Sequence, residues 1–272
     1  MAENRNTTLG PGGFLPPTLP SPAPSGTSTR SLSGLPHPRS HPLRAGSAKE
    51  DTIRRYVEDR IMHINRRYVK KFGIPEPGDE VVGYRSMSEL CKDLEALVNI
   101  IWLSGTPSLQ IPYLLNIANE FTTWVTSFPP SPTATFSILH KLDHCFASLL
   151  SGLDIETKET LPGFESGPRG GMSRTDMVRC KSLVEQTRVI IVDVMNKEPE
   201  EVEEVDEDGD ATDADQTESG AEEKKFVDPN WDEDEDGLAM DVAKVYENTL
   251  VQLGEVLGEG ASIAEIPRRT DI

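Results

Sequence analysis

The sequence has few aromatic residues and no long apolar run, and both absences limit its class. Aromatic residues make up 6% and hydrophobic residues 36% of the 272 residues. Such a chain cannot bury its whole length in a core, so we expect one folded unit with disordered flanks. The apolar runs are short, as at residues 189–192, which excludes a membrane-spanning helix. Residues 1–13 lack the basic start and apolar stretch of a secretory signal, so we expect none.

Cysteine and positive charge are also scarce. The three cysteines, Cys91, Cys145 and Cys180, stand singly in helical patterns, which predicts reduced, buried thiols and a location in the cytoplasm and/or nucleus. The formal net charge is -19. This charge argues against a simple nucleic-acid-binding surface, because phosphate binding requires clustered positive charge.

Motifs of catalysis are missing as well. The Gly-rich stretch at residues 167–173 lacks the lysine that reaches terminal phosphates, which excludes a phosphate-cradling ATPase. No Ser/His/Asp, Cys/His or paired-carboxylate arrangement stands out. We therefore predict a protein that is not an enzyme and binds no cofactor.

Two segments have the composition of disordered chain. Residues 1–46 are rich in Pro, Ser, Thr and Gly, and residues 197–236 form an acidic linker. Residues 196–236 hold 20 acidic and 3 basic side chains, a net charge of -17. Like charges in such an acidic segment repel one another, so we expect the segment to stay solvated. Residues 259–272 are expected to be a flexible tail.

The rest of the chain follows helical periodicity. Helices are expected at about residues 47–72, 86–104, 106–128, 131–151, 172–196 and 236–257. The fold class is therefore all-α: a five- to six-helix bundle made of residues 47–196 and a C-terminal helix, 237–258, that packs on them. Capping boxes are expected at Ser47 with Glu50 and at Ser173 with Asp176. The broad apolar girth of the 172–196 helix predicts a central position.

The first helix has a basic outer face. Its six candidate partner-binding side chains are Arg54, Arg55, Arg66, Arg67, Lys70 and Lys71. Three interpretations remain open: a solvated face, a partner of the acidic linker, or a surface for nucleic acid or anionic lipid.

Trp231 is a further candidate partner-binding residue. It lies among carboxylates, the composition of a short motif whose ring fills a partner's pocket. The alternative is that the ring packs on the bundle beside the last helix.

Two patterns suggest metals without completing a site. Residues 232–237 match the opening of a calcium loop, but Ala243 stands where a bidentate Glu is needed. His140 and His144 lie four apart beside Asp143, the basis of a metal-assisted hydrolase hypothesis, but a third ligand set is not visible. We predict no metal.

Five blocks, at residues 35–40, 55–60, 66–73, 108–118 and 172–180, together resemble a group of filamentous-fungal proteins. Some members of that group carry a meiotic recombination label. The resemblance implies a nuclear or meiotic accessory role.

The leading hypothesis is a non-catalytic helical adaptor that binds an unidentified protein and is gated by its acidic segment. The alternative is a nuclear accessory factor for nucleic acid or chromatin, binding DNA or histones through the basic helix. The oligomeric state stays open.

Overall fold

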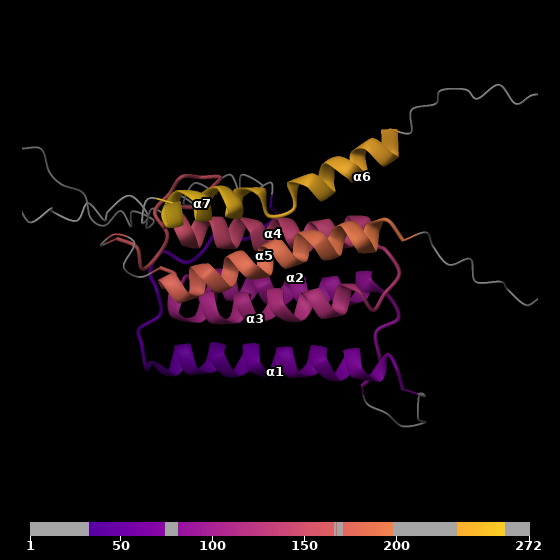
Figure 1. Cartoon of the computed structure of the whole chain (residues 1–272). Coiled ribbons are helices and arrows are strands. Elements are labelled where there is room, and N and C mark those ends of the chain that lie inside the picture. The colour runs from indigo at the N-terminus through magenta and orange to yellow at the C-terminus, as the bar shows by residue number, and fades with distance from the viewer. Residues whose placement is uncertain (1–32, 74–80, 166, 168–170, 198–232, 259–272) are drawn as a thin grey trace, which may run out of the picture. The chain divides into compact units, whose positions relative to one another are not determined.

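The computed structural model describes residues 33–73, 81–165, 167, 171–197 and 233–258. Its helices are α1 (Ala48–Lys70), α2 (Met87–Leu103), α3 (Pro107–Val125), α4 (Pro132–Ser151), α5 (Arg174–Met195), α6 (Glu233–Lys244) and α7 (Glu247–Gly258). Within these residues the only β-structure is an isolated bridge between Leu153 and Thr160. The predicted all-α bundle is confirmed (Figure 1). No helix in the described ranges is long and apolar enough to cross a membrane.

Serine caps begin the helices where the sequence predicts them. The Ser47 hydroxyl accepts the amide N–H of Glu50 at 3.3 Å, and Ser173 with Asp176 forms the full reciprocal capping box. The Glu50 carboxylate reaches one residue further back than expected and accepts the N–H of Gly46 at 2.7 Å. Each cap satisfies amides that the first helical turn leaves without partners.

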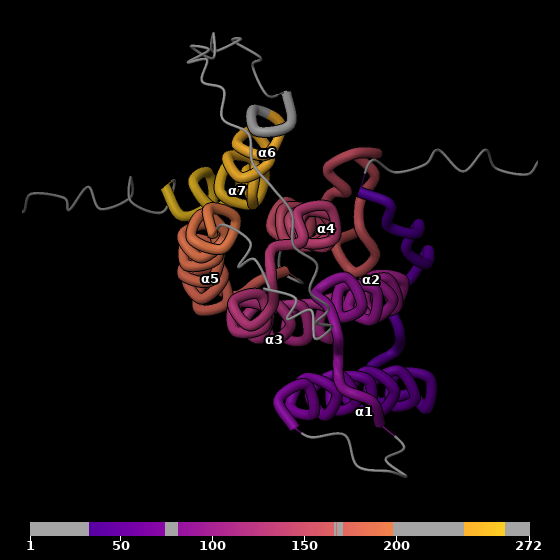
Figure 2. The backbone as a smooth tube through the Cα atoms, turned by 90° about the vertical axis from the view of Figure 1, so that its right-hand side faces the viewer, coloured from indigo at the N-terminus to yellow at the C-terminus, as the bar shows by residue number. Residues whose placement is uncertain are grey.

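α4 is the central helix of the described bundle. It packs against α2, α3 and α7, and Figure 2 shows it between α2 and α7. The prediction that the 172–196 helix is central is wrong. α5 lies at the edge beside α3 and α7, and Val178, Val189 and Val192 are exposed. A helix with apolar residues on all sides is central only when other elements cover every side. In α5 one side, which carries these valines, faces outward.

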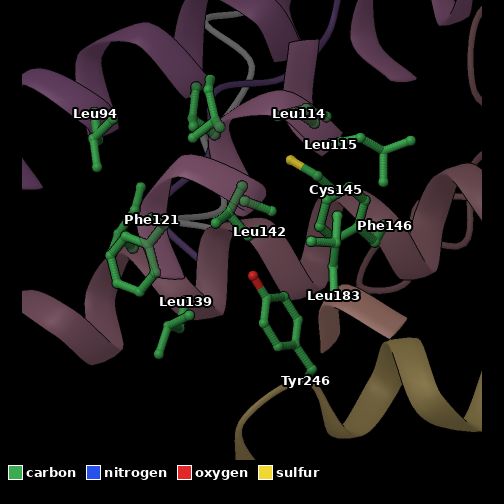
Figure 3. Close-up of a cluster of buried hydrophobic side chains, with 14 of the residues drawn as sticks. Leu94, Leu114, Leu115, Phe121, Leu139, Leu142, Cys145, Phe146, Leu183 and Tyr246 are labelled. Atoms are coloured by element: carbon green, nitrogen blue, oxygen red, sulfur yellow. The ribbon is translucent and has the colours of Figure 1, made fainter. Parts of the chain in front are cut away.

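The core gathers side chains from several helices. Figure 3 shows Leu114 and Phe121 of α3 facing Leu142 of α4, with Tyr246 entering from the C-terminal segment. The three cysteines are buried free thiols, as predicted. Burial raises the pKa of Cys91 to about 12, so this thiol stays protonated and unreactive at neutral pH.

Residues 33–46 lie against the bundle, although the sequence assigned them to the Pro/Ser-rich arm. Leu35 and Leu43 are buried. The Leu43 amide donates to the Thr106 hydroxyl at 2.8 Å, and the Lys141 ammonium donates to the Gly34 carbonyl at 3.2 Å. Isolated leucines in a Pro-rich stretch give no periodic pattern, so composition alone does not reveal such docking. Residues 1–32 lie outside the described part of the chain.

The last predicted helix is divided into α6 and α7 by Val245 and Tyr246. Tyr246 has φ +57, a left-handed conformation that a residue with a side chain rarely adopts. Its ring is buried, 6.1 Å from the ring of Phe146 between centroids. The Val245 carbonyl accepts a hydrogen bond from Arg188 of α5 at 2.8 Å. The break between α6 and α7 therefore directs the Tyr246 side chain toward the core, while the Val245 carbonyl keeps a hydrogen-bond donor in Arg188.

Asp143 of α4 caps the start of α7. Its buried carboxylate accepts the Thr249 amide at 2.8 Å, the Thr249 hydroxyl at 2.6 Å and the Asn248 amide at 3.3 Å. The Asn248 side-chain amide adds a fourth hydrogen bond at 2.9 Å. A negative charge at this position also favours the positive end of the α7 dipole. Asp143 thus supplies the N-cap that the chain itself lacks at Tyr246.

We expect Asp143→Ala to destabilise the protein by about 3 kcal/mol, because it leaves buried amides of α7 without an acceptor. Urea unfolding and hydrogen exchange over residues 247–257 measure the effect, with exchange accelerated in α7 first. The exposed Asp193→Ala substitution on α5 is the control and should change stability by less than about 0.5 kcal/mol. Unchanged α7 protection in the Asp143 variant would contradict the capping role.

Candidate partner-binding surface on α1

α1 is attached to α2 by two buried apolar side chains and an arginine network. Val57 and Ile64 are buried. Arg67 donates to Asp93 at 2.8 Å and lies 4.0 Å over the centroid of the Tyr84 ring. A guanidinium that is both ion-paired and stacked on a ring is held in one position. Arg67, predicted as a partner-binding residue, therefore holds α1 on α2.

The other predicted basic residues differ in their exposure and in their contacts. Arg54 pairs with Glu50 at 2.9 Å, and the Lys71 ammonium lies 4.7 Å over the ring of Phe128. Arg55 and Arg66 are exposed, and Arg66 contacts the neutral sulfur of Met62 at 3.2 Å. Lys70 is half-buried. Part of the predicted face thus faces inward, and the chemistry available to a partner is concentrated at Arg55 and Arg66.

An apolar groove with a volume of ≈ 790 Å³ lies between α1 and α3. The α1 side includes Met62, Arg66 and Val69, and the α3 side includes Pro112 and Tyr113. Met62 is 48% and Val69 67% exposed. The Tyr113 hydroxyl donates to the Glu58 carboxylate at 2.8 Å across this groove. Burial, together with that hydrogen bond, raises the pKa of Tyr113 to about 12, so the hydroxyl remains a donor at neutral pH.

The groove is not among the features predicted from the sequence. Tyr56 and Phe72 share the helical spacing of the apolar stripe that contains Val57 and Ile64, yet both are exposed. Met62 and Val69 are seven residues apart and so lie on one face of α1, outside that stripe. This second apolar stripe was the available signal for the groove.

The described structure does not test whether Trp231 acts together with the basic helix. Trp231 lies outside the described residues, and α6, which begins at Glu233, packs on α5. Figures 1 and 2 show α6 and α1 on opposite sides of the bundle. The partner-binding roles of Trp231 and of α1 are therefore separate proposals.

The predicted metal patterns do not form a site in the described residues. His140 is exposed, whereas His144 is buried and donates to Asp154 at 3.1 Å. Burial raises the pKa of the Asp154 carboxyl, but the hydrogen bonds from His144 and two backbone amides outweigh it and hold the pKa well below its usual value. Asp143 caps α7, so the structure does not bring it together with His140 and His144 as metal ligands. Across the described ranges no group of three or more His, Cys, Asp or Glu is placed to hold a metal. The calcium-like motif falls on residues whose side chains are not described.

The fold defines an all-α bundle protein. The chain belongs to the TFB6 family, described as Subunit 11 of the general transcription factor TFIIH, whose model matches residues 83–254. The match begins between α1 and α2 and ends within α7. α1 and its groove thus lie largely outside the matched region.

Two relatives are similar to the chain. An uncharacterised protein of Schizosaccharomyces pombe is 27% identical over 143 residues, covering 52% of this chain and 76% of that protein. The general transcription and DNA repair factor IIH subunit TFB6 of Saccharomyces cerevisiae is 24% identical over 193 residues, covering 55% of this chain and 54% of the yeast subunit. No solved structure matches the chain.

Family membership refines the earlier resemblance. The matches are to the TFB6 family and to proteins of two yeasts, so they do not identify the filamentous-fungal group, and they give the meiotic recombination label no support. Membership in a transcription-factor family agrees with the predicted location in the cytoplasm and/or nucleus.

We expect Arg67→Ala to lower the free energy of unfolding by about 1–2 kcal/mol, because the substitution removes a charge-assisted hydrogen bond and a stacked cation. Arg55→Ala, on the exposed side of the same helix, is the matched control and should be nearly neutral. Urea denaturation followed by circular dichroism compares the two. Equal stability of both variants would contradict the assignment of Arg67 to the attachment of α1.

Proposed function

We propose that this chain is a non-catalytic, nuclear subunit-type adaptor that associates with a TFIIH-type assembly. The observation that carries this proposal is the family match over residues 83–254, which includes α2 to α6 and most of α7. The protein similar to it in Saccharomyces cerevisiae bears the name of a general transcription and DNA repair factor IIH subunit. Transcription and DNA repair are therefore the processes in which we place the chain.

The outer face of α5 is the surface of the matched bundle that we assign to this assembly. Val178, Val189 and Val192 lie on one face, because positions 11 and 14 residues along a helix differ from the first by only about 20° and 40°. Lys181 and Glu185 lie on the same face, with 3.9 Å between the Lys181 Nζ and the Glu185 Oε1. Exposed apolar side chains interspersed with charge are typical of interfaces between subunits that also exist separately.

This proposal predicts that TFIIH subunits co-purify with the tagged full-length chain from nuclear extract of its own organism. The double substitution Val189→Glu and Val192→Glu should abolish co-purification, because it places two charges in an interface that would have to bury them. Both residues are exposed, so the fold should be retained. Quantitative mass spectrometry of the purified material is the measurement.

Val69→Glu on α1, outside the matched region, is the control and should leave co-purification unchanged. Recovery of nucleic acid and histones without TFIIH subunits would refute the proposal and favour the chromatin alternative.

We also propose that the acidic segment regulates access to α1. Residues 60–73 hold five basic and no acidic side chains, whereas residues 198–232 hold 16 acidic and two basic ones. In Figure 1 the C-terminal ends of α1 and α5 and the beginning of α6 lie at the same end of the bundle. A segment of this length extends up to about 120 Å, so its reach includes α1. Its tethering raises its local concentration at α1 to the millimolar range, about what is expected for flexible linkers.

We expect exchange of the acidic residues of 198–232 for Asn and Gln to raise the affinity of the full-length chain for a poly-glutamate probe at least about fivefold, because the competing charges are gone. Fluorescence anisotropy at low and high salt measures the effect, which should shrink as salt rises. Adding Arg55→Ala and Arg66→Ala to the neutralised chain should remove the gain. Equal affinity before and after neutralisation would contradict regulation by the segment.

A further inference from the structure

The groove between α1 and α3 is a helix face without a covering helix in the described structure. On α1 its lining repeats at positions 58, 61, 62, 65, 66, 69 and 70. This is the spacing of three, four and seven residues with which one helix packs against another. The stripe extends over three turns of α1, or about 18 Å. The ordinary occupant of such a surface is a second helix lying along it.

The volume and the lining residues of the groove suit apolar side chains of a bound partner. Its volume of ≈ 790 Å³ lies within the range of about 300–1,000 Å³ that is typical of sites for compact ligands. Met62 and Val69 form one wall and Pro112 with Tyr113 the other. Methionine adapts its shape to different partners, and the ring of Tyr113 offers a rigid apolar surface. The groove therefore favours Leu-sized or Phe-sized side chains presented at helical spacing.

The charge at the rim of the groove indicates which charge a bound helix should carry. Arg66 lines the groove, and no carboxylate in the described residues forms an ion pair with it. Residues 60–73 contain no acidic side chain. The negative charge of Glu58 lies at the other end of the α1 stripe, where it accepts the hydrogen bond from Tyr113. An occupant with carboxylates beside Arg66 would be attracted, and one with lysines there would be repelled.

The chain's own acidic segment supplies the charge but not the apolar stripe. Between residues 198 and 225 the only aliphatic side chains larger than alanine are Val202 and Val205. Phe226 and Trp231 come late in the segment, shortly before α6 begins at Glu233. Figure 2 shows α6 on the opposite side of the bundle from α1. The segment can lie over the basic rim of α1, but it cannot fill the groove with helical anchors. The acidic segment is therefore not the helical occupant that the groove favours.

We propose that the α1–α3 groove binds, in trans, an amphipathic helix of a partner protein with an apolar stripe at i, i+3, i+4 and i+7 and acidic residues along its flank. This site is distinct from the α5 face assigned to the TFIIH-type assembly. It goes beyond the proposed function, because the greater part of the groove belongs to α1, outside the matched region. The acidic segment then competes with the flank of that helix for the rim of the groove.

The test uses a designed helical peptide of about 18 residues, with leucines at i, i+3, i+4 and i+7 and glutamates on the flank. Fluorescence anisotropy measures its binding to the full-length chain. A peptide with the same residues but leucines spread around the helix should bind at least about tenfold more weakly. On the chain whose acidic residues at 198–232 are exchanged for Asn and Gln, a peptide with lysines in place of the glutamates should also bind more weakly than the glutamate peptide, because Arg66 repels it.

Variants then locate the binding site. Met62→Glu and Val69→Glu should each weaken binding about tenfold or more, because the charge enters the apolar wall. Val189→Glu on α5 is the matched control: an equally exposed valine on another helix, whose substitution should leave peptide binding unchanged. Circular dichroism and thermal unfolding confirm that each variant is folded.

Each outcome decides the proposal. Equal loss in the Val69 and Val189 variants, or equal binding of patterned and scrambled peptides, overturns it. Binding that appears only after neutralisation of residues 198–232 supports the groove and shows that the segment covers it. If sedimentation velocity shows a dimer of the chain that Val69→Glu dissociates, a second copy is the occupant and the proposal is overturned. Failure of the TFIIH association would leave this test unaffected, because that association is assigned to α5.

Discussion

The buried carboxylate of Asp143 is the contact on which the C-terminal part of the bundle depends. Residues 198–232 separate α5 from α6, so α6 and α7 must be held by contacts made after a long loop closes, at an entropic cost. α7 itself buries only Thr249 and Leu253. Four hydrogen bonds to one carboxylate compensate for this small apolar area, and they also pair backbone amides that the first turn of α7 leaves without an acceptor in the helix. The placement of Tyr246 in the core follows from that cap.

The same arrangement recurs at the other outlying helix. α1 also buries few apolar side chains, and Arg67 adds an ion pair with Asp93 and a stacked contact with Tyr84. Charged side chains thus serve two purposes in this protein. Those directed toward the bundle attach peripheral helices, and those directed outward, such as Arg55 and Arg66, remain available to partners. A count of basic residues along α1 does not distinguish the two groups, because the acceptor of Arg67, Asp93, comes from α2.

The features that could be predicted from the sequence are those determined by residues close to one another in the chain. Helical periodicity, the Ser173 cap and the buried cysteines all follow from local pattern, and the structure agrees with them. The division at Tyr246 does not follow, because its cause is Asp143, more than 100 residues earlier in the sequence. The groove is a similar case, since Met62 becomes part of a wall only when α3 supplies the other one. Long-range pairing, rather than composition, decides these features.

The positions of the two exposed faces bear on how partners interact. In Figure 2 the outer side of α5 and the outer side of α1 point in different directions, so the two faces are separate surfaces of the bundle. The acidic segment begins just after α5 ends and is long enough to extend to α1. Under the proposed regulation of α1 by the acidic segment, a partner that covers the C-terminal end of α5 would change how readily this segment competes at the basic rim of α1. Electrostatic competition through a tether can therefore couple the two faces without any change in the packing of the bundle.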